Sequence, residues 1–199
     1  TPLRRTLPKT GHISGEHVNG VVGDVMLSSS TSSRFKVTLQ ESDAGAAFEN
    51  SLGVYEVRSD GRIADVRLLT ENVKLGGTFL VENIDDGSTL GFFIVQDGAR
   101  LTSASALDVA GVGIDVLGGT AMLTQGGDIV DGATLFLSHD ASLNVDGAQH
   151  ALSGVKIGAS VSLQIGFEDQ IRDEVSSDED FQDVVFTVEA LPPMDIIAG

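Results

Sequence analysis

Cysteine and tryptophan are both absent from this 199-residue chain, and tyrosine occurs only once. Without cysteine the protein has no disulfide, no thiolate zinc site and no cysteine nucleophile. Small exported domains that lack disulfides often use a bound metal ion to hold their fold. The scarcity of aromatic rings that could bind sugars argues against glycoside hydrolysis, which also needs a pair of carboxylates in a cleft.

Long hydrophobic runs and basic residues are scarce as well. No apolar run reaches the length of about 18 residues that a membrane-spanning helix needs, so we expect no membrane insertion. Twelve Lys and Arg stand against 29 Asp and Glu, and the net charge of -17 argues against nucleic acid as a partner. No apolar segment follows the basic start Thr1–Lys9, and the first residue is not methionine. We therefore expect a processed product or a fragment of a larger protein.

Glycine and alternating apolar residues are plentiful, and both favour short strands joined by tight turns. The chain holds 24 glycines, and 41% of its residues are hydrophobic, enough for a substantial core. Apolar and polar residues alternate at residues 35–39 and 161–167, which is typical of half-buried strands. The predicted strands are residues 35–39, 52–57, 63–69, 78–82, 89–95, 107–117, 121–124, 134–138, 150–157, 161–167 and 184–188.

These strands predict an all-β fold, a β-sandwich or jelly roll of about ten strands with at most one short helix. Helical preference occurs only at Ala44–Asn50. We expect the β-sandwich domain at residues 34–190. An N-terminal arm or first strand is predicted at residues 1–33, and a C-terminal tail at residues 191–199.

Acidic residues gather near the C-terminus, where residues 168–183 contain eight Asp and Glu and one Arg. Predicted strands lie on both sides of this loop. If they pair as an antiparallel hairpin, or lie side by side in one sheet, the two ends of the loop meet. Two carboxylates about 4 Å apart repel by about 4 kcal/mol at an effective dielectric constant of 20. Calcium accepts six to eight oxygen ligands in flexible geometry and turns this repulsion into attraction. The predicted calcium ligands are Glu168, Asp169, Asp178, Asp180 and Asp183; a solvated acidic loop is the alternative.

Several segments resemble the DUF4114 family and occur in the family's order. They are residues 50–57 (NSLGVYEV), 90–95 (LGFFIV), 138–150 (SHDASLNVDGAQH), 165–169 (IGFED) and 178–186 (DEDFQDVVF). The chain departs from the family pattern at Gln182, where the family has Asn, and its acidic loop lacks the usual glycines. The resemblance implies a β-rich module of large secreted or surface bacterial proteins, often found beside calcium-binding repeats and adhesin parts. It also adds Asn144 and Asp146 as candidate calcium ligands, although Asn-x-Asp-Gly is equally an ordinary turn sequence.

We therefore expect a calcium-stabilised structural or adhesion module of a larger exported protein, secreted or on the cell surface. The alternative is a calcium-dependent carbohydrate-binding domain in which the ion contacts sugar hydroxyls; carbohydrate or another surface protein would then be the partner. We do not expect an enzyme. Ser138, His139 and Asp140 are adjacent, so on a strand His139 faces away from both neighbours, and no Gly-x-Ser-x-Gly nucleophile motif occurs.

Overall fold

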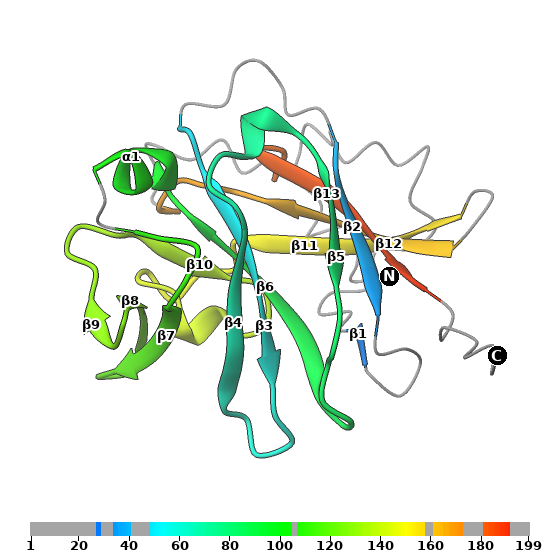
Figure 1. The fold of residues 1–199 in the computed structure, drawn as a ribbon, viewed down its shortest axis with the longest axis horizontal. Helices are drawn as coiled ribbons and strands as arrows, with labels where there is room; N and C mark the ends of the chain where they lie inside the picture. Colours follow the sequence, from blue (N-terminus) through cyan, green and yellow to red (C-terminus); the bar gives the residue numbers. More distant parts are fainter. Residues whose placement is uncertain are drawn as a thin grey trace, which may run out of the picture.

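Three antiparallel sheets make up the described part of the computed structural model, which covers residues 27–28, 34–40, 48–104, 107–157, 161–172 and 181–191 (Figure 1). The all-β fold predicted from the alternating sequence is confirmed. None of the helices within these ranges is long and apolar enough to cross a membrane.

The sheets contain five, five and three strands within the described residues. The outer sheet consists, in spatial order, of β11 (Ala151–Ile157), β12 (Val161–Phe167), β13 (Val184–Ala190), β2 (Phe35–Leu39) and β5 (Thr78–Val81). The central sheet consists of β1 (Leu27–Ser28), β6 (Thr89–Val95), β3 (Ser51–Val57) and β4 (Ile63–Thr70), and β10 (Leu135–Leu137) also pairs with β6. The small sheet consists of β7 (Val112–Leu117), β8 (Thr120–Gln125) and β9 (Asp128–Ile129).

The central sheet is the middle layer, because apolar side chains pack against both of its faces. One core, which includes Phe92 and Phe186, lies between the central and outer sheets. The other core, which includes Tyr55 and Leu123, lies between the central and small sheets. β3 and β6 are accordingly buried along nearly their whole length, whereas β2 and β13 alternate between buried and half-buried residues. The predicted sandwich is present, and a third sheet that the sequence pattern did not indicate covers its central layer.

Two glycines make room for aromatic rings between β3 and β6. Gly53 lies opposite Phe93 and Gly91 lies opposite Tyr55 in the antiparallel register. A Cβ at Gly53 would be 2.1 Å from Phe93 Cζ, and one at Gly91 would be 2.2 Å from Tyr55 Cε2. The rings therefore occupy the space above the two glycines, which lets large side chains fit between closely packed layers.

Short helices lie in the connections, where the sequence prediction was partly wrong. Of the predicted helix Ala44–Asn50, residues 44–47 lie outside the described residues, and residues 48–50 are not helical. A helix, α1 (Gly98–Ser103), instead follows β6. Its start packs against β3: Ala99 N donates to Glu49 O, and a Cβ at Gly98 would be 2.2 Å from Ser51 Oγ. This tertiary contact, rather than local helix preference, positions α1.

The other strand predictions agree with the structure to within a few residues, with one larger difference. The predicted strand 107–117 begins only at Val112, because the chain turns at Gly111, whose φ is 83°. Two 3-10 turns, η2 (Val73–Leu75) and η3 (Ala141–Leu143), complete the connections among the described residues. Their preceding residues Asn72 and Asp140 each accept a hydrogen bond from a backbone N–H two residues later.

Candidate metal-binding site

The two strands that flank the acidic loop are hydrogen-bonded antiparallel neighbours, the condition under which the sequence predicts that the two ends of the loop meet. β12 pairs antiparallel with β13, and Phe167 at the end of β12 lies opposite Val184 at the start of β13. Asp183 N donates to Phe167 O at 3.1 Å, and Asp169 N donates to the Asp183 carboxylate at 2.8 Å. The residues that follow β12 and precede β13 therefore meet at one end of the outer sheet.

Three of the predicted calcium ligands gather at this end of the sheet. Glu168, Asp169 and Asp183 each contribute a carboxylate oxygen to a group in which all ligand atoms lie within 4.8 Å of one another. Glu168 and Asp169 are 0% exposed, and Asp183 is half-buried. Buried carboxylates at such a separation are costly unless cations, hydrogen-bond donors or protons offset their charge. The two other predicted loop ligands, Asp178 and Asp180, lie outside the described residues.

Side chains from the central sheet reach into the same group. Asn50, immediately before β3, is 0% exposed, and its Nδ2 donates to Asp169 Oδ2 at 2.6 Å. Asn50 Oδ1 accepts from Asp97 N at 3.1 Å, and Gln96 Nε2 donates to the backbone O of Asp169 at 2.6 Å. The acidic group therefore lies where the outer sheet meets the central sheet. Asn50 lies in the family-like segment 50–57 but is not among the ligands that the sequence predicts, because no local pattern signals a contact between residues 119 positions apart.

Asn144 binds backbone groups around it and lies outside the three-carboxylate group. Its side chain is almost fully buried, with Oδ1 accepting from Leu137 N at 2.7 Å and Nδ2 donating to Ala148 O at 2.8 Å. These bonds hold the turn after η3 against β10. Its role as a calcium ligand stays a prediction, but its two polar atoms already have structural partners.

Asp146 is linked to the acidic group through a buried histidine. His150 Nε2 lies 2.9 Å from Asp146 Oδ2, and its Nδ1 lies 2.9 Å from the backbone O of Glu168. The His150 ring stacks on Phe136 with centroids 3.7 Å apart. Burial acts to raise the pKa of Asp146, but hydrogen bonds from Ala148 N, Arg172 N and His150 outweigh it and lower that pKa. Asp146 thus stays ionised and ties the 144–150 turn to the chain leaving β12.

A second acidic group lies elsewhere on the central sheet and has a different electrostatic character. Glu56, Asp65 and Asp85 also offer oxygens within 4.8 Å of one another. Arg58 forms ion pairs with both Asp65 and Asp85, and Arg67 Nη2 lies 3.6 Å from Glu56 Oε1. Two guanidinium groups already balance most of the charge, so this group is an ion-pair network and a poor site for a metal ion.

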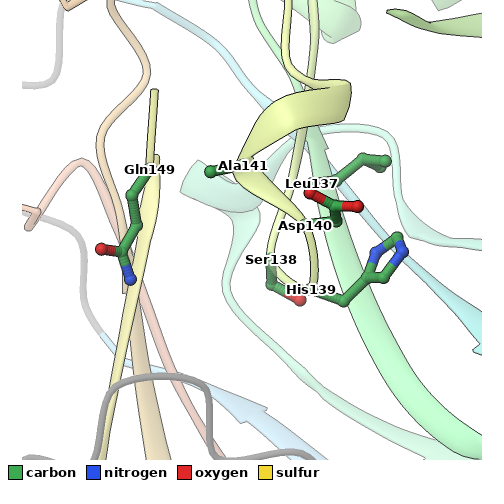
Figure 2. Close-up of a pocket in the computed structure, with 6 residues that line it drawn as sticks. All are labelled: Leu137, Ser138, His139, Asp140, Ala141 and Gln149. Atoms are coloured by element: carbon green, nitrogen blue, oxygen red, sulfur yellow. The ribbon is translucent and has the colours of Figure 1, made fainter. Parts of the chain in front are cut away.

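The adjacent residues Ser138, His139 and Asp140 line a hollow of about 200 Å³ together with Leu137, Ala141 and Gln149. Ser138 Oγ accepts from Phe92 N at 2.9 Å, and the Asp140 carboxylate accepts from Ser142 N and Oγ. In Figure 2, Gln149 lies on one side of the loop, whereas His139 and Asp140 project from the other. A serine-histidine-aspartate triad requires its side chains to converge on one point. The polar side chains around this hollow do not converge in that way.

Fold and site together define an all-β protein of sandwich type with a buried acidic group where two sheets meet. The family model "Domain of unknown function (DUF4114)" matches residues 84–190, more than half of the chain, and the chain belongs to this family. The match runs from just before β6 to the end of β13 and includes all three gathered carboxylates. No curated protein and no solved structure matches the chain.

Proposed function

We propose that this chain is a calcium-binding, calcium-stabilised structural or adhesion module of a larger exported protein. The observation that carries the proposal is the group formed by Glu168, Asp169 and Asp183, with carboxylate oxygens within 4.8 Å and two side chains fully buried. A divalent cation offsets the repulsion between these carboxylates and adds binding free energy to the stability of the fold.

Calcium suits this group better than magnesium does. Calcium tolerates six to eight oxygen ligands in flexible geometry, whereas magnesium demands a near-octahedral shell and gives up its waters reluctantly. Backbone carbonyls and the loop between β12 and β13 would supply the remaining oxygens. Extracellular calcium modules typically bind with dissociation constants of about 10⁻⁴–10⁻³ M, so the site would be filled outside the cell and empty in the cytosol.

Stabilisation would act at the junction between two sheets. Asn50 and Gln96 from the central sheet both donate to Asp169, which follows β12 of the outer sheet. An ion held by Asp169 and its neighbours would therefore favour the closed arrangement of both layers. At a hundredfold excess over the dissociation constant, binding adds about 2.7 kcal/mol to the free energy of unfolding.

Burial of the acidic group favours this structural role over carbohydrate binding. A lectin-like site needs an ion with open coordination positions that face solvent and sugar hydroxyls. Glu168 and Asp169 have no exposed surface, which supports an ion enclosed by protein.

Thermal melts of the full chain with EGTA and with CaCl₂, at equal ionic strength, test the proposal. Equal ionic strength matters because any salt screens the self-repulsion of a chain with a net charge of -17. We expect calcium to raise the melting temperature of the wild type, and magnesium to raise it less. Asp183→Asn should lose the calcium-dependent rise and, with one carboxylate removed, should melt above the wild type in EGTA.

The matched control is Asp65→Asn, which removes an aspartate from the acidic group that Arg58 already balances. This variant should keep the full calcium-dependent rise. The absence of any rise in the wild type, or its survival in Asp183→Asn, would show that these acids do not hold calcium.

A further inference from the structure

The side-chain amide of Asn50 is held in one orientation between the central and outer sheets. Asn50 is 0% exposed, and its Oδ1 accepts from Asp97 N at 3.1 Å while its Nδ2 donates to Asp169 Oδ2 at 2.6 Å. The backbone N–H of Asp97 can only donate, so a flipped amide would set two donors against each other there. The flip would also turn the amide oxygen toward the Asp169 carboxylate. Both hydrogen bonds therefore fix the same orientation.

The backbone around Asn50 is anchored as well. Val73 N in η2 donates to Asn50 O at 2.9 Å, and Ala99 N in α1 donates to Glu49 O at 3.0 Å. The Asn50 donor therefore faces the acidic group from a backbone that two neighbouring elements hold in place. Because this donor is shielded from water, its hydrogen bond to a carboxylate is stronger than the same bond would be at the surface.

We propose that Asn50 is a positioning residue of the calcium site, whose amide orients the Asp169 carboxylate without ligating the ion itself. This inference rests on the proposed calcium site and adds a residue that aligns one of its ligands from the central sheet. The atom of Asn50 that faces the acidic group is Nδ2, and an amide N–H donates hydrogen bonds, whereas calcium takes oxygen ligands. Loss of a partner that orients a metal ligand typically weakens metal binding by about 10–100-fold.

Other contacts of Asp169 act on its backbone. Gln96 Nε2 donates to the Asp169 backbone O, and Asp169 N donates to the Asp183 carboxylate. These two bonds do not fix rotation about the side-chain bonds of Asp169. The Asn50 hydrogen bond acts on the carboxylate, which is the group that offers an oxygen to the ion. Removal of the Asn50 amide should therefore lower calcium affinity as well as stability.

The test is a calcium titration of the full isotope-labelled chain at constant ionic strength, followed by NMR at the backbone amides of Glu168 and Asp169. We expect Asn50→Ala to weaken calcium binding by about tenfold or more, because the Asp169 carboxylate is no longer aligned. The matched control is Ser51→Ala, which removes the hydrogen bond of the neighbouring buried side chain to Glu71 O. This control should bind calcium with the dissociation constant of the wild type.

The wild type supplies a second readout that does not depend on the folding of a variant. We expect the side-chain amide resonances of Asn50 to shift with the same calcium dependence as the backbone amide of Asp169. The exposed side-chain amide of Asn83, between β5 and β6, should not shift.

Three results would overturn the positioning role: an unshifted Asn50 amide, an unchanged dissociation constant in Asn50→Ala, or an equal weakening in Ser51→Ala. The absence of calcium binding to the wild type would instead overturn the calcium site itself, and this inference with it.

Discussion

Individual positions in the central sheet have little space for a larger side chain, because both faces of the sheet are packed. Gly53 shows this most directly. Its missing side chain makes the space that the Phe93 ring fills, and the carbonyl oxygen of Arg67 would lie 2.7 Å from an added Cβ. The backbone oxygen cannot move away as a flexible side chain would.

We expect Gly53→Ala to lower the free energy of unfolding by about 1–3 kcal/mol through overpacking. Urea denaturation measures the change. Gly118→Asn is the control, because Gly118 has no neighbour within 4 Å, and Asn tolerates its left-handed φ of 62°. The control should stay within about 0.5 kcal/mol of the wild type. An equally small effect of Gly53→Ala would show that the two strands can separate to admit a methyl group.

At the scale of elements, alternation in the sequence predicted most of the strands, because a half-buried strand must place apolar residues at every second position. β2 and β13 show this pattern plainly. β3 and β6 are instead buried along nearly their whole length. Their apolar runs predicted strands but did not indicate that both faces of these strands are covered. Helix α1 was missed because it depends on contacts with Glu49 and Ser51, far from it in sequence.

The turn after η3 depends on one buried side chain, Asn144. We expect Asn144→Ala to lower the free energy of unfolding by about 1–3 kcal/mol, because the buried Leu137 N loses its acceptor. This loss should be the same in EGTA and in calcium, since Asn144 lies outside the three-carboxylate group. Chemical denaturation in both buffers measures this loss. The control is Asn72→Ala, which should lower the free energy of unfolding by less because Asn72 is less buried than Asn144. A loss of stability seen only in calcium would instead show that Asn144 is a calcium ligand.

At the scale of the whole molecule, the small sheet shares its core with the central sheet, and the three layers should unfold together. Leu123 on β8 is 1% exposed and belongs to this core, whereas Ile129 on β9 is 45% exposed. We expect Leu123→Ala to cost about 2–5 kcal/mol in a single unfolding transition and Ile129→Ala to change stability by less than about 0.5 kcal/mol. Denaturation followed by circular dichroism and tyrosine fluorescence checks this. Two separate transitions would show that the small sheet folds independently of the sandwich.

The class of the fold and part of the candidate site follow from local pattern alone. Residue alternation predicted an all-β fold, and the strands flanking the acidic loop predicted that Glu168, Asp169 and Asp183 meet, because paired strands bring the two ends of their connection together. Tertiary structure alone decided that a third sheet covers the sandwich and that Asn50 joins the acidic group from the other layer. It also decided that His139 pairs with Tyr55 rather than with its sequence neighbours. The Tyr55–His139 and Asn50–Asp169 contacts join residues that are 84 and 119 positions apart in the sequence. A local pattern carries no signal for side chains that meet only when separate sheets pack.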